Sequence, residues 1–128
     1  MREVAIIGVG TSVFGKFSER SLEELGREAL SVALKDAGIS PRKTQFSYCS
    51  TLYGGMVIGE RMLKEVGITD IEVTNVENAC AGGATAFRRT WYDVASGLYD
   101  IGIAIGVESM TTSPIAGKLI PPGPGDVQ

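Results

Sequence analysis

Short apolar runs alternate with helix-forming stretches along most of this chain, and that alternation restricts its fold more than any other feature. Each run has the length of a strand and is too short for an ordinary buried helix. The runs lie at Val4–Val9, Phe46–Tyr53, Ile71–Val76 and Ile101–Val107. The first and last contain almost no polar residue, which is typical of strands covered on both faces of a sheet.

Helix-forming stretches separate these runs, at Ser21–Ala37, Met56–Val66 and Thr85–Ser96. Ser21 and Glu24 predict a capping box at the start of the first helix, and Gly38 predicts its C-terminal cap. The resulting order, β-α-β-α-β-α-β, predicts an α/β fold. Its sheet should be mostly parallel, with helices on both faces and right-handed crossovers.

Cys80 lies where the third apolar run gives way to a helix, within the stretch Val76–Ala84. A thiol there would face unpaired N–H groups and the positive dipole end of the first helical turn, which favour the nucleophilic thiolate. Glycine is a poor helix former, so Gly82 and Gly83 indicate close approach of an acyl group or of neighbouring backbone. The alternative is a small buried cysteine in a tightly packed helix.

Four loops are expected at the carboxyl ends of the strands, around Gly10, Gly54, Asn78 and Glu108. Sites in parallel sheets form beyond this edge, which favours the catalytic interpretation of Cys80. Glu108 is either a catalytic group or, as we favour, an anchor for its loop through hydrogen bonds. Cys49 lies inside a strand with no neighbour that would ionise it, and is interpreted as a core residue.

The composition of the 128 residues is that of an ordinary globular domain, with 44% hydrophobic residues, 21% charged residues and a net charge of −3. The chain lacks a basic cluster that would neutralise phosphates, so a nucleic-acid partner is not expected. Its apolar runs are too short to span a bilayer and it begins without a signal peptide, so we expect a cytoplasmic protein with free thiols. It contains no histidine. The base for any cysteine chemistry must therefore be another residue type or lie on another piece of protein.

The segment Asn78–Ala86, followed by Gly106–Met110, resembles the thiolase superfamily. The resemblance is closest to the sterol-carrier-protein-type thiolases, whose nucleophile lies in a similar N-x-C-x-x-G-x-x-A setting. The opening Ile7–Gly15 also resembles the first strand and turn of that group. The likeness extends to about Thr112. It implies a thiolase N-terminal α/β half-domain at residues 1–112 and the irregular start of a loop region or linker at residues 113–128.

By this resemblance, Cys80 is acylated during thiolysis of a 3-oxoacyl-CoA or the reverse Claisen condensation, and its backbone N–H helps to form an oxyanion hole. The residues implied to contact substrate are Asn78, Gly82, Gly83 and Met110. A coenzyme A thioester is then the substrate, with no bound cofactor and no metal. The alternatives on the same fold are a hydroxymethylglutaryl-CoA synthase-like or ketosynthase-like condensing enzyme and a carbon–carbon lyase. A non-catalytic scaffold subunit of a thiolase-like complex is the alternative outside enzymes.

A thiolase has two similar α/β halves, and this chain lacks the last strand of the first half, the inserted loop region and the histidine motifs of the second. We therefore expect a fragment or a separately encoded subunit that is inactive alone. The missing strand would leave an unpaired sheet edge, and Phe87, Trp91 and Val94 would form an apolar helix stripe. Such surfaces favour association, so we expect a homo- or hetero-oligomer with a complementary half.

Overall fold

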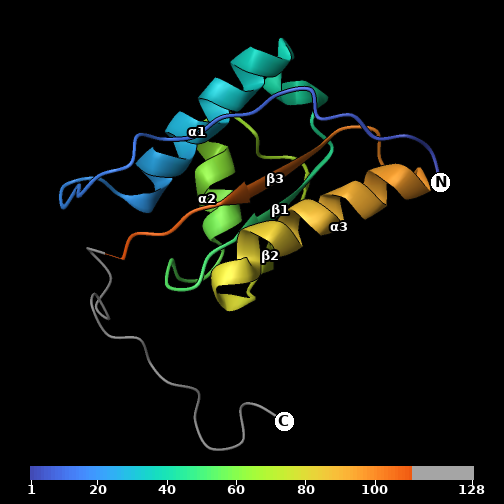
Figure 1. Ribbon diagram of the computed structural model, residues 1–128. Helices are drawn as coiled ribbons and strands as arrows, with labels where there is room; N and C mark the ends of the chain where they lie inside the picture. Colours follow the sequence, from blue (N-terminus) through green and yellow to red (C-terminus); the bar gives the residue numbers. More distant parts are fainter. Residues whose placement is uncertain (111–128) are drawn as a thin grey trace, which may run out of the picture.

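The computed structural model describes residues 1–110, in which a small parallel sheet lies between helices (Figure 1). Its helices and strands are α1 (Leu22–Ala37), β1 (Phe46–Ser50), α2 (Ile58–Lys64), β2 (Glu72–Val76), α3 (Gly82–Ser96) and β3 (Gly102–Gly106). Two short 3-10 helices lie at Pro41–Lys43 and Ala79–Ala81. The predicted linker at 113–128 and the last two residues of the predicted half-domain lie outside the described residues.

The sheet has the strand order β2-β1-β3, and both neighbouring pairs are parallel. In the central strand, Cys49 pairs with Asn75 of β2 on one side and with Ile105 of β3 on the other. Parallel neighbours need a crossover, which α2 supplies between β1 and β2 and α3 supplies between β2 and β3. The predicted α/β class and parallel sheet are confirmed.

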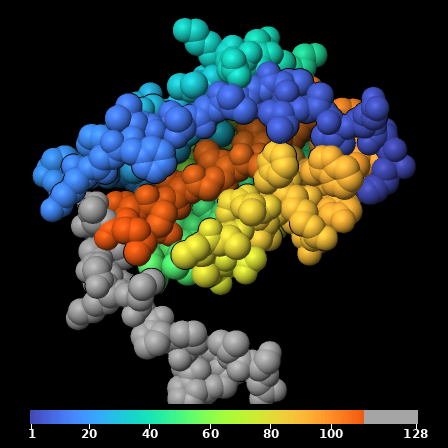
Figure 2. Space-filling view, viewed as in Figure 1, coloured from blue at the N-terminus to red at the C-terminus, as the bar shows by residue number. Residues whose placement is uncertain are grey.

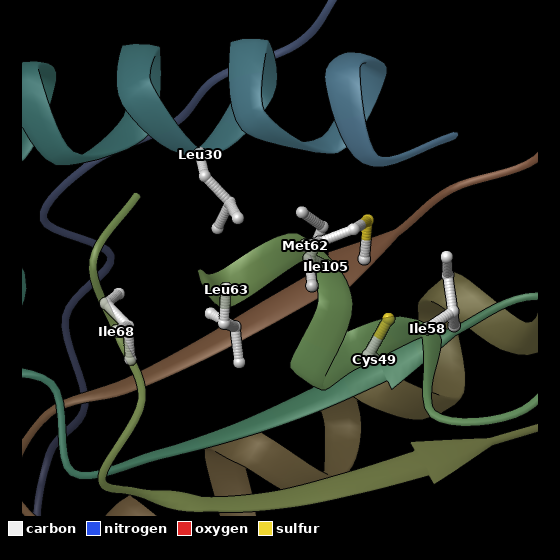
Figure 3. Packing of buried hydrophobic residues seen from close by; sticks show 7 residues of the cluster. All are labelled: Leu30, Cys49, Ile58, Met62, Leu63, Ile68 and Ile105. Carbon is white, nitrogen blue, oxygen red and sulfur yellow. The ribbon is translucent and has the colours of Figure 1, made fainter. Parts of the chain in front are cut away.

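Helices cover both faces of the sheet, as adjacent residues of β1 show. Gly59 of α2 lies against Cys49, whereas Gly82 of α3 lies against Ser50. Successive strand residues point to opposite faces, so α2 and α3 are on opposite sides. The main core fills the α1/α2 side (Figure 3) and consists of Leu30, Cys49, Ile58, Met62, Leu63, Ile68 and Ile105.

Both predicted ends of α1 are confirmed. Ser21 Oγ accepts a hydrogen bond from the Glu24 N–H at 3.1 Å, and the Glu24 carboxylate accepts one from the Ser21 N–H at 2.8 Å. Gly38 ends the helix with a left-handed φ of 66°, which glycine adopts without the steric penalty of a side chain.

Residues 4–9 do not form the predicted strand. They run along α1 (Figure 1) and pair with no strand among the described residues. Ile6 and Val9 are each 66% exposed instead of buried. The segment is held by α1 side chains, because the Val9 N–H donates to Asp36 at 2.9 Å and the Val13 N–H donates to Glu28 at 3.1 Å. The apolar pattern alone predicted a strand, but a strand also needs a neighbouring strand with which its backbone forms hydrogen bonds.

Two glycines allow this segment to approach α1 closely. A methyl group at Gly10 would lie 2.5 Å from the backbone nitrogen of Ala33, and one at Gly8 would lie 2.7 Å from Ala37 Cβ. Neither distance is tolerated between real atoms, so both positions require glycine in this arrangement.

One edge of the sheet is formed by β3, which is covered less completely than predicted. Ile105 is buried, but its neighbours Ala104 and Gly106 are exposed. In Figure 2 the orange residues of β3 and the following loop reach the surface between the blue N-terminal segment and the yellow residues of α3. Of the helices within residues 1–110, none has the length and apolarity that crossing a bilayer requires.

Candidate functional site

A tight turn between β2 and α3 carries Cys80. β2 ends at Val76, the chain forms the 3-10 helix Ala79–Ala81, and α3 begins at once at Gly82. Cys80 is exposed and is a free thiol. This placement agrees with the predicted strand-to-helix junction and contradicts the alternative of a small buried cysteine.

The backbone of the turn has an unusual conformation immediately before the thiol. Ala79 has a φ of +44°, a value rare for residues that carry a side chain. Its N–H donates to the Glu77 carboxylate, and the Ala81 N–H donates to the Asn78 carbonyl at 2.9 Å. The turn therefore closes on itself and holds Cys80 between two hydrogen-bonded residues.

The paired glycines after Cys80 have different surroundings. Gly82 is buried, and a side chain there would collide with Ser50 Oγ on β1. Gly83 is exposed, and a methyl group on it would meet no atom within 4 Å. The Ser50 side chain thus accounts for Gly82, whereas the space beside Gly83 is open to a ligand.

Asn78 and Thr85 connect the two sides of the turn. Asn78 Nδ2 donates to Thr85 Oγ1 at 2.9 Å, and the Thr85 hydroxyl donates to the Ala81 carbonyl at 3.1 Å. Sequence reasoning did not single out Thr85. Its position five residues after Cys80, on the first turns of a helix, was the available signal.

Glu108 anchors two loops at the carboxyl edge of the sheet, as we favoured from the sequence. One of its carboxylate oxygens accepts hydrogen bonds from the Leu52 N–H at 2.7 Å and the Tyr53 N–H at 3.1 Å. The Thr51 hydroxyl lies 3.4 Å from the same oxygen. These contacts tie the loop after β1 to the loop after β3, and they occupy the carboxylate.

Met110 belongs to a hollow that the cysteine turn does not line. It lines a hollow of about 220 Å³ that is formed by the loop after β3 and the segment at 12–17, including Val13, Phe14 and Phe17. Cys80 is not among the residues around this hollow. Asn78, Gly82 and Gly83 thus adjoin Cys80 on one turn, whereas Met110 lines a hollow that none of these four residues lines.

The second thiol has the opposite surroundings. Cys49 is fully buried in the core cluster, and burial, with a smaller contribution from the charge of Glu60, raises its pKa to about 12. The thiol therefore stays protonated at neutral pH. This confirms the core interpretation of Cys49.

Within residues 1–110, histidine, cysteine and acidic side chains do not gather in any group of three or more that would hold a metal ion. The chain as a whole also lacks histidine, the commonest general base. This arrangement can therefore carry out nucleophilic attack by one accessible thiol, that of Cys80, which lies just before the N-terminus of α3.

Comparison with known proteins identifies relatives that are much longer than this chain. Acetyl-CoA acetyltransferase of Methanocaldococcus jannaschii is 38% identical over 116 residues, which cover 87% of this chain and 30% of that protein. Chicken (Gallus gallus) sterol carrier protein 2 is 36% identical over 118 residues, covering 90% of this chain and 22% of that protein. The chain thus spans less than a third of the length of either relative.

A solved structure has the same fold. Acetyl-CoA acetyltransferase from Syntrophomonas wolfei superimposes with a TM-score of 0.73 and 21% identity, over 85% of this chain and 29% of that one. The sequence profile of the thiolase N-terminal domain matches residues 4–121, which is most of the chain. The resemblance seen in the cysteine segment therefore holds along the sequence and in the fold, and the chain belongs to the thiolase family.

Proposed function

We propose that this chain supplies the nucleophile half of a thiolase-type acyl-CoA C-acyltransferase, with Cys80 as the residue that is acylated. The observation that carries the proposal is the exposed Cys80 thiol on the turn before α3, in a chain of the thiolase family. The substrate is a coenzyme A thioester, as the names of the acetyltransferase relatives suggest. The reaction is thiolysis of a 3-oxoacyl-CoA or its reverse.

In the thiolytic direction, Cys80 Sγ forms a bond to the 3-oxo carbonyl carbon. The bond between that carbon and carbon 2 breaks, and its electron pair stays on carbon 2, which takes a proton and leaves as acetyl-CoA. The thiolate of a second coenzyme A then attacks the acyl-cysteine, and Cys80 departs as thiolate. In this second step one thioester replaces another, at little net free-energy cost. The acyl-cysteine thus divides one difficult step into two, each with a lower barrier than the direct reaction.

The remaining groups of the reaction have proposed places. The Cys80 N–H contributes to the oxyanion hole that stabilises the charge on the attacked carbonyl. Asn78 and Gly83 border the acyl group. Gly82 allows the start of α3 to pack closely on Ser50 and so fixes the position of this turn. Met110 borders a part of the substrate farther from the reacting carbonyl. The proton carriers belong to a complementary thiolase half, since this chain has no histidine. The chain is accordingly inactive by itself.

The test is acyl transfer to the protein from acetoacetyl-CoA, measured by mass spectrometry on the native assembly. The acyl group should appear on the tryptic peptide 65–88, which contains Cys80, and not on peptide 44–61, which contains Cys49. Cys80→Ser should abolish the adduct and transfer, because a hydroxyl without a strong base is a far weaker nucleophile. Cys49→Ala serves as the matched control and should keep the adduct. Transfer retained by the serine variant would exclude Cys80 as the nucleophile.

A further inference from the structure

The turn that carries Cys80 adopts a backbone conformation that its own sequence does not favour. Ala79 has a φ of +44°, although its methyl side chain disfavours that region. Such conformations persist only where the surrounding structure holds them in place. The groups that hold this turn therefore determine where the Cys80 thiol lies.

We infer that Asn78 and Thr85 form a clamp that positions the Cys80 turn; this rests on the proposed role of Cys80 as nucleophile. Asn78 precedes the cysteine and Ala81 follows it. The Thr85 hydroxyl accepts from Asn78 Nδ2 at 2.9 Å and donates to the Ala81 carbonyl at 3.1 Å. One hydroxyl thus joins both ends of the turn, and Thr85 acts on the turn without needing to touch the substrate.

A second threonine on the same helix shows what is specific to the clamp. The Thr90 hydroxyl donates to the Ala86 carbonyl at 3.0 Å, four residues earlier, as threonines in helices commonly do. The bond from Thr85 to Ala81 is of the same kind. Thr85 differs because its oxygen also accepts a hydrogen bond from a side chain that lies before the helix. The Thr90 hydroxyl also lies 3.4 Å from the Ile103 carbonyl of β3. The clamp therefore acts across the Cys80 turn, whereas the Thr90 contacts lie within α3 and toward β3.

The clamp gives Asn78 a positioning role in addition to its proposed place beside the acyl group. Its side-chain nitrogen is directed to Thr85, and its carbonyl accepts from the Ala81 N–H at 2.9 Å. Both bonds restrain the segment from Asn78 to Ala81. Loss of either clamp residue should therefore loosen the segment that holds Cys80.

The test is the rate at which iodoacetamide alkylates Cys80 in the native protein, in the assembly in which it purifies. Thr85→Val keeps the size and the β-branch but removes both hydrogen bonds. A turn released from the clamp spends less time in the orientation that presents the thiol, so we expect the rate to fall by about five-fold, the equilibrium factor that corresponds to one hydrogen bond of ordinary net strength. Asn78→Ala removes the donor from an exposed position and should give a similar fall. Thr85→Ser keeps the hydroxyl and should restore the rate to within about two-fold of the native protein.

Thr90→Val is the matched control, because it removes the same type of helix hydroxyl bond away from the cysteine, and it should leave the Cys80 rate unchanged. Circular dichroism establishes that each variant is folded. If Thr85→Val does not fold, Asn78→Ala carries the comparison. A Thr85→Val rate equal to that of Thr90→Val, or a Thr85→Ser variant as slow as Thr85→Val, would overturn the clamp.

Acyl transfer by Cys80→Ser separates this inference from the proposed function. If Cys80→Ser abolishes acyl transfer while the clamp variants react normally with iodoacetamide, the clamp is wrong and the nucleophile stands. If Cys80→Ser still transfers acyl groups while the clamp variants alkylate slowly, the clamp positions a thiol that is not the nucleophile.

Discussion

Selective alkylation of the two cysteines is the prediction that the structure quantifies best. Iodoacetamide reacts with thiolates that it can reach. Cys80 is exposed on a turn, whereas Cys49 is fully buried between the sheet and α2. We expect Cys80 to be modified in the native protein while Cys49 remains unmodified.

The difference can be estimated from the ionisation of Cys49. With a pKa of about 12, only about one Cys49 in 10⁴ is a thiolate at pH 8. Steric exclusion from the core lowers its rate further, so Cys80 should react faster by at least about 10³. Raising the pH to 10 increases the Cys49 thiolate to about one in 100, but the folded core still excludes the reagent. Labelling of Cys49 should therefore require unfolding rather than high pH alone.

The assay is favourable because trypsin separates the two thiols. Cys49 falls on peptide 44–61 and Cys80 on peptide 65–88, so mass spectrometry follows both rates in one sample. In urea the unfolded chain exposes both thiols, so their alkylation rates should become similar. This measurement is the internal control that both cysteines can react with iodoacetamide. Equal rates in the native protein, or Cys49 ahead of Cys80, would refute both the burial of Cys49 and the accessibility of the candidate nucleophile.

Two other surfaces give predictions of stability and association. Gly10→Ala should lower the free energy of unfolding in urea by about 1–3 kcal/mol, because the methyl group collides with the α1 backbone. Gly83→Ala, with open space beside it, is the control and should be neutral or stabilising; equal effects would contradict the close packing of residues 8–10 on α1. Trp91 is 37% exposed on α3, next to Phe87, and Trp91→Glu should reduce association of the chain in sedimentation velocity at micromolar concentration. Val32→Glu, at a 46% exposed position on α1, should change association little; the same loss in both variants would argue against a role of the α3 face.

Features set by neighbouring residues were predictable from the sequence. The capping box at Ser21 and the left-handed Gly38 fixed both ends of α1, because both signals act within a few residues of the helix end. The central parallel strands followed from apolar runs joined by helices. Cys80 and Glu108 were placed at the carboxyl edge by the topology of parallel sheets, and there Glu108 takes the favoured anchoring role.

Features that depend on contacts between distant elements were not predictable. The need for glycine at position 82 comes from Ser50, on a strand 32 residues earlier in the sequence (82 − 50), which brings α3 close to β1. The clamp by Thr85 depends on the path of the turn at Ala79, whose positive φ no local signal announces. Met110, which the resemblance implies as a substrate contact, lines a hollow that does not include Cys80.

The exposure of residues 4–9, which differs from the prediction, and the exposure of Phe87 and Trp91 on α3, which agrees with it, have the same physical origin. Residues 4–9 have the composition of a strand buried on both faces, yet Ile6 is 66% exposed. Helix α3 turns Ala86 and Ala95 inward and leaves Phe87 49% exposed. An apolar pattern shows that a segment suits burial but not what covers it, and residues 1–110 offer one sheet and three α-helices for that purpose. The chain spans less than a third of its relatives, and these exposed apolar residues are the surface on which the proposed complementary half would have to pack.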